Sequence, residues 1–518
     1  MGERSRNGGL KAGITRRRFL GALSAGTTLV ALSGSLGCEP TASTKASAAP
    51  RGQGQARVFR SRPDLHPPAI KVNTNMPGTA PGHIFISPKK GPGEEAPTQD
   101  GPLIIDSNGE PLWFHPLQDA EADAFNFEVQ TYRGEPVLTW WEGYHTGYGQ
   151  GEYVICDHTY REIRRFGAGN GYEGDHHEFL ITPEDTALIT IYNEVRRDLS
   201  GVGGPEDGVV LEGIVQEIDI QTGEVLFEWH SLDHVRLEES YYRPPPDLRS
   251  PFDYFHINSV DSHPDGYLII SARRTSTVYK VDRKTGEIVW RLGGKKSDFG
   301  MGYGTRTDWQ HDARRHPDGI ITIFDNGTVQ REVQSRGAVV EIDAGDMSAT
   351  LVGEYTHPNE ILAATQGNVQ VLPNGNVFVG WGSEPLLSES RWDGKLLFDA
   401  SFPSEVESYR AFRFPWNGKP QDSPAVFAEA GPEDRVTLYV SWNGTTEVDI
   451  WQVLVGDGSD GLKPARSAPR KGFETAVTLH TEEPYVAVSA KDSSGRILGT
   501  SEAIKPVRAS ASTKQTRL

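Results

Sequence analysis

The stretch His263-Pro264-Asp265-Gly266-Tyr267-Leu268-Ile269-Ile270 joins a turn signal to an apolar, β-branched run. This combination predicts a hairpin that leads into a buried strand. The same pattern recurs from Thr182, from His316 and from Leu372. The four turn prolines lie 81, 53 and 56 residues apart. Such a period is typical of propeller blades that carry insertions.

A second turn, of the form Asp-x-x-Thr-Gly-Glu, lies further along some units. It occurs at 219–224 and at 282–287, with degenerate copies near Asp106 and Asp343. Two hairpins per unit make four strands, so we predict an all-β fold with a six-bladed β-propeller over residues 58–430. Two of the six blades are weakly marked and precede residue 175. The insertion at 241–252 is expected to arch over one face.

The C-terminal part of the chain has a different residue pattern. Four runs there alternate apolar with polar residues, at 436–443, 448–453, 475–479 and 485–490. Alternation with period two indicates strands that are buried on one face. We predict a small fibronectin-like β-sandwich over residues 431–507, followed by a disordered tail over 508–518.

Charge and cysteine content exclude several classes of protein. With 70 acidic and 52 basic residues the formal charge is −18, which argues against nucleic acid or an anionic membrane face as the main partner. An anionic ligand therefore needs a local basic pocket. Cys38 and Cys156 are too few for a disulfide framework or a cysteine zinc site. Cys156 is predicted to be a buried thiol.

The N-terminus has the pattern of an export signal. Thr15-Arg16-Arg17-Arg18-Phe19-Leu20 is followed by a weakly apolar run to Leu32, and this resembles a twin-arginine leader over residues 1–37. Gly, Ser and Thr interrupt the run, so it predicts no permanent membrane span. Leu36-Gly37-Cys38 resembles a lipoprotein box, whereas Ala46-Ser47-Ala48 resembles an ordinary cleavage site. A lipid anchor on Cys38 and simple cleavage both stay open.

Residues 38–57 are rich in Ala, Ser, Thr, Gly and Pro and are expected to form a flexible tether. The leader holds six basic residues and one acidic residue, so its removal changes the formal charge from −18 to −23. We expect the twin-arginine machinery to export the folded protein to the periplasm or cell surface, with or without a lipid anchor.

Three histidines occupy equivalent places in the repeat. His177 and His311 lie six residues before their turn prolines, and His256 lies eight before its own. That distance equals one short strand. The first strands of propeller blades line the central channel, so we expect the three imidazoles to converge at one mouth. The next unit has Gln366-Gly367-Asn368 at this place, so the histidine is not part of the repeat consensus.

Polar and basic residues accompany these histidines. Asn258 follows His256 by two residues, which places both on one face of an extended strand. Arg273 ends the following strand, and Arg314 comes shortly after His311. A guanidinium group beside neutral imidazoles suits a tetrahedral oxyanion such as sulfate or phosphate.

At these residues the sequence resembles the arylsulfotransferase (ASST) family, in the branch found in actinobacteria and fungi. The matching stretches are 255–260, 270–273, 309–314, 367–370 and 441–444. The resemblance spans residues 58–505. It implies a propeller enzyme that moves a sulfuryl group from an aryl sulfate to a phenol without a nucleotide donor. The chain departs from the well-described bacterial enzymes of the family in lacking an obvious N-terminal sandwich domain and a cysteine pair for a disulfide.

The resemblance also implies residue roles. His311 matches the nucleophile that becomes sulfated, and His256 and Arg273 match the pair that grips the sulfuryl oxygens. His177 matches the fourth catalytic member, with the adjacent His176 as an alternative. Further substrate-binding candidates are His176, Asn258 and Arg314. No metal and no cofactor is required, and the partners are a small aryl sulfate donor and a phenol acceptor.

The implied reaction has two steps. An imidazole nitrogen attacks sulfur in line with the departing phenolate, through a loose transition state. An acceptor phenol then attacks the sulfohistidine while a neighbouring base takes its proton. Tyr172, Tyr254 and Trp309 are candidates for holding the aryl ring, with a role in core packing as the alternative.

Two other functions stay open at the level of sequence. In the first, His177, His256 and His311 bind one metal ion in a hydrolase or lyase. In the second, the protein is a non-catalytic extracellular propeller that binds a ligand or a cell-wall polymer, and the C-terminal sandwich is an adhesion module.

Overall fold

The computed structural model describes residues 56–246, 250–328 and 334–508. Within these ranges the chain is nearly all β, as predicted, and its strands form eight small sheets. The expected leader, the tether up to residue 55 and the tail from residue 509 lie outside the described residues. No helix in the described part is long and apolar enough to cross a bilayer. The helical segments are η1 (Ser200–Val202), α2 (Ser231–His234), η2 (Leu237–Glu239) and η3 (Pro317–Gly319).

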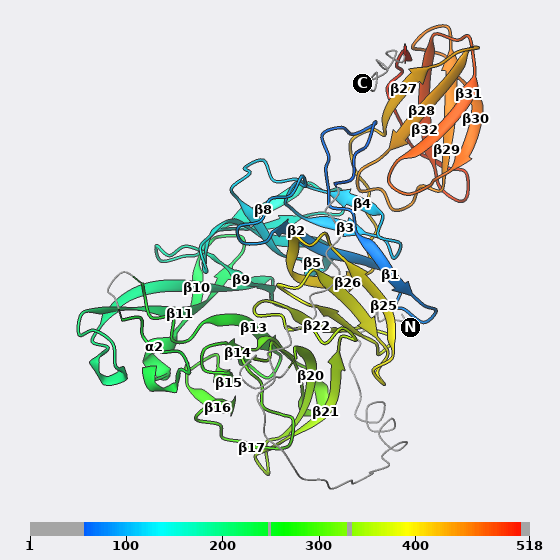
Figure 1. Cartoon of the computed structure of the whole chain (residues 1–518). Helices are drawn as coiled ribbons and strands as arrows, with labels where there is room; N and C mark the ends of the chain where they lie inside the picture. Colours follow the sequence, from blue (N-terminus) through cyan, green and yellow to red (C-terminus); the bar gives the residue numbers. More distant parts are fainter. Residues whose placement is uncertain (1–55, 247–249, 329–333, 509–518) are drawn as a thin grey trace, which may run out of the picture.

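Six sheets follow one another along residues 71–414, and two more stand apart at the C-terminal end, in orange and red (Figure 1). The first three sheets have the orders β26-β2-β3-β4, β5-β6-β7-β8 and β9-β10-β11-β12. Their strands are β2 (His83–Lys90), β3 (Leu103–Ile105), β4 (Pro111–Phe114), β26 (Val406–Phe414), β5 (Asp123–Tyr132), β6 (Glu135–His145), β7 (Gly149–Cys156), β8 (Glu162–Phe166), β9 (Asp175–Ile181), β10 (Thr186–Arg197), β11 (Gly208–Asp219) and β12 (Val225–His230).

The next three sheets have the orders β13-β14-β15-β16, β18-β19-β20-β21-β17 and β22-β23-β24-β25-β1. Their strands are β13 (Ile257–His263), β14 (Tyr267–Ala272), β15 (Thr277–Asp282), β16 (Ile288–Gly293), β17 (Gly300–Met301), β18 (His311–Arg315), β19 (Ile320–Asp325), β20 (Arg336–Asp343), β21 (Ser348–Thr356), β22 (Asn368–Val371), β23 (Val377–Gly380), β24 (Leu386–Ser390), β25 (Leu396–Ser401) and β1 (Lys71–Asn75).

The predicted turns lie between paired antiparallel strands, and local chemistry explains them. In the turn between β11 and β12, Oδ1 of Asp219 accepts hydrogen bonds from the backbone N–H groups of Gln221 and Thr222, both at 2.8 Å. Gly223 then takes a φ of 76°, which glycine adopts without steric cost. The Asp282 turn repeats this arrangement between β15 and β16. Both copies of the predicted second turn are therefore hairpins.

Strands from the two ends of the six-sheet region pair with each other. β26 pairs with β2, and β1 pairs with β25. The edge strand of each sheet also contacts the next in the cyclic order β26, β5, β9, β13, β18, β22 and back to β26. The three strands that carry or follow the histidines, β9, β13 and β18, are consecutive neighbours in this order.

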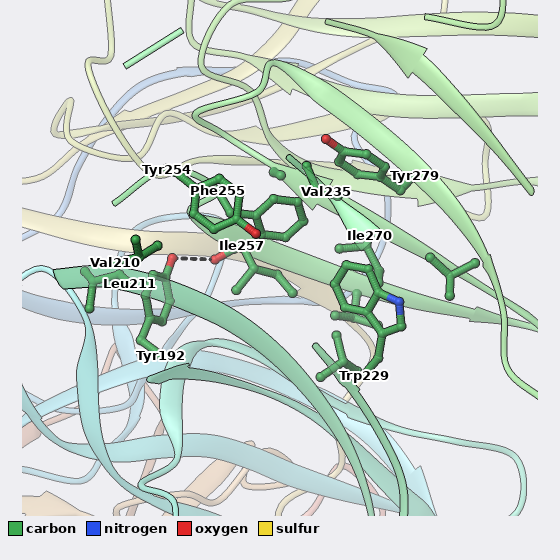
Figure 2. Packing of buried hydrophobic residues seen from close by; sticks show 14 of the residues in the cluster. Tyr192, Val210, Leu211, Trp229, Val235, Tyr254, Phe255, Ile257, Ile270 and Tyr279 are labelled. Atoms are coloured by element: carbon green, nitrogen blue, oxygen red, sulfur yellow. Dashed lines mark hydrogen bonds between the residues drawn. The ribbon is translucent and has the colours of Figure 1, made fainter. Parts of the chain in front are cut away.

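Apolar clusters fill the spaces between neighbouring sheets. One cluster joins the β9–β12 and β13–β16 sheets and includes Trp229, Tyr254 and Phe255 (Figure 2). The hydroxyl of Tyr192 in this cluster donates to the carbonyl of Ile257 at 2.7 Å. Burial of each such large side chain stabilises the fold by roughly 1.5–3 kcal/mol. The backbone just before His256 is thereby anchored between two sheets.

The last two sheets have the orders β31-β28-β27-β34 and β30-β29-β32-β33, and a core that includes Trp451 lies between them. Their strands are β27 (Ala425–Ala430), β28 (Arg435–Ser441), β29 (Ile450–Gly456), β30 (Lys463–Pro469), β31 (Thr475–His480), β32 (Tyr485–Lys491), β33 (Ile497–Thr500) and β34 (Val507–Arg508). β27 and β28 are paired neighbours. The predicted boundary at residue 431 therefore falls inside one sheet.

Three residues assigned to flexible ends have fixed partners. Ala56 forms an isolated bridge with Pro68, and Arg57 pairs with Glu110 at 2.5 Å. Arg508 is the last residue of β34. Backbone pairing and ion pairing hold these three positions, so residues 56, 57 and 508 belong to the folded part of the chain.

Candidate active site

The structure brings the three repeat histidines together. His177 lies in β9, His256 directly precedes β13 and His311 begins β18. The ring centroids of His177 and His256 are 5.1 Å apart, and those of His256 and His311 are 6.5 Å apart. We call His177, His256 and His311 the histidine cluster. Its convergence follows from the equivalent positions of these residues in successive sheets.

Each imidazole of the histidine cluster is held at Nδ1. The Nδ1 atom of His177 lies 2.6 Å from Oδ1 of Asp175, and that of His256 lies 2.5 Å from Oδ2 of Asp253. These contacts point the Nε2 edges of the two rings away from their carboxylate partners. A hydrogen bond at one ring nitrogen sets which tautomer the imidazole adopts.

The partner of His311 is an amide instead of a carboxylate. Nδ1 of His311 lies 2.6 Å from Oδ1 of Asn326. Nδ2 of Asn326 donates to the carbonyls of Ala363 and Gln366, both at 3.0 Å, so its Oδ1 must be the acceptor. Nδ1 of His311 therefore carries the proton and Nε2 carries the lone pair. Nε2 has one long contact, with the backbone N–H of Gln366 at 3.3 Å.

The imidazoles of His256 and His311 are neutral. Burial lowers the pKa of His256 to about 4, although Asp253 raises it in part. Burial also lowers the pKa of His311 well below its usual value, and the positive charge of Arg273 lowers it further. A neutral imidazole with a free lone pair is the form that acts as a nucleophile.

Arg273 supplies a positive charge without a carboxylate partner. Its backbone N–H donates to the carbonyl of His256 at 2.9 Å, and its Nη2 donates to the carbonyl of Ala364 at 2.9 Å. Its Nε is buried without a hydrogen-bond partner, and no carboxylate in the described ranges forms an ion pair with it. Burial lowers its pKa to about 10, so it stays protonated at neutral pH. Arg273 is therefore free to bind an anion.

Unlike Arg273, Arg274 has a carboxylate partner. Its Nε lies 3.2 Å from Oδ2 of Asp253, and its guanidinium lies 4.1 Å from the ring centroid of Tyr242. Tyr242 belongs to the predicted insertion at 241–252, which thus reaches the edge of the site. Arg273 and Arg274 both lie near the ring of Trp309, at 5.2 and 5.4 Å.

Four non-glycine residues in or near the histidine cluster have a left-handed backbone. His256, Trp309, Asp312 and Gln366 all have positive φ values, of 53°, 56°, 52° and 67°. Each such non-glycine residue costs on the order of 1–3 kcal/mol and persists only where the surroundings impose it. Strain of this kind is typical of functional sites.

Arg314 does not join the histidine cluster. It forms ion pairs with Glu178 at 2.7 Å and with Asp312 at 2.8 Å. Arg410 of β26 also pairs with Glu178, at 3.1 Å. The charge of Arg314 is therefore balanced inside the protein, and the structure gives no support for its expected role in substrate binding.

Asn258 lies in a different geometry from the one expected. His256 has a left-handed backbone, and the register shifts between Ile257 and Ser259, so simple alternation along the strand does not apply. Nδ2 of Asn258 donates to the carbonyl of Gln310 at 2.7 Å, and its Oδ1 is buried without a partner. Asn258 thus holds the residue that precedes His311.

Of the two adjacent histidines, His177 is the one beside His256. The ring of His176 stacks on His177 at 4.1 Å and lies 4.2 Å from Phe125. Its pKa is lowered well below the usual value, first by burial and then by His177. His176 therefore lies behind the histidine cluster as a neutral, largely aromatic contact.

Residues that the sequence analysis missed complete the site. Asp175 and Asp253 precede their histidines by two and three residues, a spacing that could have identified them. Asn326 follows β19 without a motif. Tyr409 of β26 contacts the rings of His176, His177 and His311 at 5.6, 5.7 and 6.5 Å. Nothing local in the sequence indicates that β26 reaches this site.

Of the three aromatic residues expected to hold the aryl ring, one lies beside Arg273 and two lie elsewhere. Trp309 lies beside Arg273, as described above. Tyr254 is fully buried in the core between two sheets (Figure 2), so it does not hold a ligand ring. Tyr172 contacts His230 at 6.4 Å and has no ring contact with the histidine cluster.

A metal fits this site less well than an anion does. Among the described residues, the group of three whose ligand atoms lie within 4.8 Å of one another is Asp175, His176 and His177, not the histidine cluster. The two oxygens of Asp175 already accept hydrogen bonds from the backbone N–H groups of His177 and Gly149. The positive charge of Arg273 also opposes a cation beside His256 and His311.

Two cavities, of about 480 and 860 Å³, lie away from the histidine cluster. Both are lined by Glu135, Pro136 and His158, near the end of β5. Phe125, near the start of β5, packs against His176. No residue of the histidine cluster lines either cavity.

The site thus combines the neutral imidazoles of His256 and His311 with a nearby guanidinium that has no carboxylate partner, as suits the transfer or binding of a small oxyanion. The sequence model of the family described as Arylsulfotransferase (ASST) matches residues 128–403, a range that includes the whole histidine cluster and Arg273. This chain belongs to the arylsulfotransferase family. Membership supports a sulfotransferase activity in general.

A search of curated proteins found no match. Several solved structures resemble the chain at low sequence identity. A protein of unknown function from Bacteroides caccae is 14% identical with a TM-score of 0.38, and the match covers 65% of this chain and all of that one. Hydrazine synthase of Kuenenia stuttgartiensis is 11% identical with a TM-score of 0.25, over 62% of this chain and 64% of that one. Regucalcin, a calcium-binding protein from Agrobacterium tumefaciens, is 16% identical with a TM-score of 0.28, over 59% and 79%.

Proposed function

We propose that this protein is an exported aryl sulfate sulfotransferase that transfers a sulfuryl group to a phenol through a sulfohistidine on His311. One observation carries the proposal: His311 presents the lone pair of Nε2, and the guanidinium of Arg273, which has no carboxylate partner, lies close enough to act electrostatically on that imidazole. A nucleophile and a cation for the developing charge are the two parts that sulfuryl transfer requires.

In the first step, Nε2 of His311 attacks the sulfur atom of the aryl sulfate. The Nε2–S bond forms, the S–O bond to the aryl group breaks, and its electron pair leaves on the phenolate oxygen. The long contact between Nε2 and the N–H of Gln366 is weak at 3.3 Å, and it is exchanged for sulfur. Positive charge develops on the imidazole, and Oδ1 of Asn326 stabilises it by accepting the Nδ1 proton in a hydrogen bond.

The other members of the cluster stabilise the sulfuryl oxygens. Charge in a loose transition state spreads over three equatorial oxygens, and Arg273, His256 and His177 are the groups proposed to stabilise it. Asp175 and Asp253 bind the Nδ1 edges of His177 and His256, so either ring can take up a proton at Nε2 when an anion binds and donate it to a sulfuryl oxygen, while its carboxylate compensates the positive charge. In the second step, an acceptor phenol attacks the sulfohistidine and gives its proton to a ring whose Nε2 is unprotonated.

The six sheets of residues 71–414 are proposed to be the blades of a propeller. The cyclic contacts among their edge strands support this, as does the pairing of β26 with β2, which joins the two ends of the six-sheet region in one sheet. The two C-terminal sheets are proposed to be a fibronectin-like sandwich that begins at β27. A channel lined by β9, β13 and β18 would place the histidine cluster at one mouth.

Export by the twin-arginine route remains part of the proposal. It rests on the arginines at 16–18 and the apolar run that follows them. Cys156 is buried and unpaired, and burial raises its pKa to about 12. A fold held by its core, without a disulfide in the described ranges, is compatible with export in the folded state.

The test is incubation with 4-nitrophenyl sulfate followed by intact mass measurement. We expect one added sulfuryl group on the wild-type protein and none on His311→Ala. His316→Gln is the matched control, because His316 lies at the end of β18 and contacts Thr322 at 2.9 Å; it should be sulfated like the wild type. Absence of both the adduct and phenol release, across several aryl sulfates, would contradict the proposal. Activity that is lost with a stoichiometric metal would instead favour a metal-dependent hydrolase.

A further inference from the structure

Tyr409 places a buried hydroxyl group beside the histidine cluster. The residue belongs to β26 and is 2% exposed, and its hydroxyl has no hydrogen-bond partner in the described part of the chain. An unsatisfied buried hydroxyl destabilises the folded state, because it has lost its hydrogen bonds to water. Native proteins rarely retain such a group without a reason, and a ligand or catalytic role is among the common ones.

The ring of Tyr409 faces the site. It meets His177 at 88° and His311 at 76°, edge to face, and it lies 5.5 Å from Phe125. A phenylalanine would make the same ring contacts, so packing does not account for the hydroxyl group. Its presence calls for a polar partner that enters the site.

Two other buried tyrosines near the histidines provide a comparison. Tyr192 donates to the carbonyl of Ile257 at 2.7 Å, and Tyr153 donates to the carbonyl of Asp175 at 2.8 Å. Both hydroxyls are satisfied by backbone and have a structural function. The hydroxyl of Tyr409 lacks such a partner, as does that of Tyr254, but Tyr254 lies in the core between two sheets, whereas Tyr409 packs against the rings of His177 and His311.

The hydroxyl of Tyr409 is a donor at every working pH. Burial raises its pKa well above the usual value of a tyrosine, although the neighbouring Arg410 lowers it in part. Arg410 itself is engaged with Glu178 and with the carbonyl of Asn258. Tyr409 thus offers a neutral O–H group, whereas Arg273, which directly follows β14 of a different sheet, offers the positive charge.

We propose that the hydroxyl of Tyr409 donates a hydrogen bond to the phenolic oxygen of the bound aryl sulfate. This role rests on the proposed function. As the Nε2–S bond forms and the S–O bond breaks, the electron pair stays on the phenolic oxygen, and the hydrogen bond stabilises its charge. A simple phenol has a pKa of about 10, below that of Tyr409, so the proton stays on Tyr409 and the product leaves as phenolate. In the second step, the same bond lowers the pKa of the acceptor phenol and favours phenols over aliphatic alcohols.

The test compares Tyr409→Phe with the wild type across aryl sulfates whose phenols differ in acidity, by single-turnover sulfation of the protein. A lost hydrogen bond to a charged oxygen should slow phenyl sulfate by about 10- to 100-fold and 4-nitrophenyl sulfate much less, because 4-nitrophenolate carries less charge on oxygen. Tyr192→Phe is the matched control and should slow all donors equally, if at all. An equal loss for all donors, or no loss, with Tyr409→Phe would overturn the role.

The outcomes separate this role from the proposed function. Sulfation of both the wild type and Tyr409→Phe with the same dependence on phenol acidity would overturn only the role of Tyr409. Absence of sulfation in the wild type would overturn both. If Tyr409→Phe does not fold, the pKa of 4-nitrophenol bound to the wild type can be measured from its absorption. We expect binding to lower the pKa of 4-nitrophenol, and an unchanged pKa would overturn the role of Tyr409.

Discussion

Nδ1 of His311 binds the amide oxygen of Asn326 at 2.6 Å, whereas His177 and His256 bind carboxylates. A carboxylate beside an imidazole favours its charged form. The amide gives the same orientation without that charge, so His311 stays neutral and nucleophilic. His177 and His256 have carboxylates that compensate a positive charge when an anion is bound.

Replacement of Asn326 by Asp should therefore convert His311 toward the protonated form. Asn326→Ala is the reference variant, because both changes remove the hydrogen bonds to Ala363 and Gln366. We expect the acid limb of the pH profile for His311 sulfation to lie at higher pH in Asn326→Asp than in Asn326→Ala. Identical profiles would contradict the role of Asn326 in keeping His311 neutral.

Removal of the Arg273 charge should have two effects. Arg273 lowers the pKa of His311, so Arg273→Gln should move the acid limb of sulfation to higher pH. Loss of a donor to the developing charge should also reduce the sulfation rate by about 10²–10³-fold. Arg315→Gln is the control, since Arg315 pairs with Asp265 at the neighbouring turn, and it should change neither quantity. A wild-type pH profile in Arg273→Gln would argue that the guanidinium does not act on His311.

The repeat made much of the fold and part of the site predictable from the sequence. Turn residues such as Asp219 and Gly223 act locally, so the hairpins they specify can be recognised without knowledge of the rest of the chain. The equivalence of His177, His256 and His311 was visible because each precedes a turn of the same kind.

Long-range pairing and local backbone distortion were not predictable in this way. β26 pairs with β2 across more than 300 residues, and no local sequence pattern predicts that pairing. Tyr409, which belongs to β26, was therefore not predicted to lie at the site. Because His256 has a left-handed backbone, side chains do not alternate regularly between the two faces at this point. The expected placement of Asn258 on the same face as His256 therefore does not hold. The charge balance of Arg314 depends on Glu178, which lies 136 residues away.

Buried neutral histidines should make the protein sensitive to acid. Burial lowers the pKa values of His256 and His316 to about 4, against about 6.5 in an unfolded chain. As the pH falls from 6.5 toward 4, the unfolded state binds more protons than the native state, and the free energy of unfolding decreases. Each residue should contribute roughly 2–3 kcal/mol of this loss by pH 4.5.

The measurement is urea unfolding of the wild type and of His316→Gln at pH 7 and pH 4.5. The variant should lose less stability than the wild type between the two values, by the contribution of one histidine. An equal loss in both proteins would show that His316 titrates normally in the native state.

Tyr160 should couple the β5–β8 sheet to the two C-terminal sheets. Its ring stacks on Trp113 at 4.7 Å, its hydroxyl donates to the carbonyl of Gly444 at 2.6 Å, and it accepts a hydrogen bond from Nε1 of Trp416 at 3.0 Å. Tyr160→Phe leaves these buried partners without the hydroxyl, so we expect a loss of about 1–3 kcal/mol in the free energy of unfolding. Tyr303→Phe is the control, because Tyr303 is fully exposed, and it should change stability by less than about 0.5 kcal/mol. Equal stabilities of the two variants in urea unfolding would show that the Tyr160 hydroxyl contributes nothing to this contact. A second transition at lower urea concentration in Tyr160→Phe alone would show that the C-terminal sheets unfold separately.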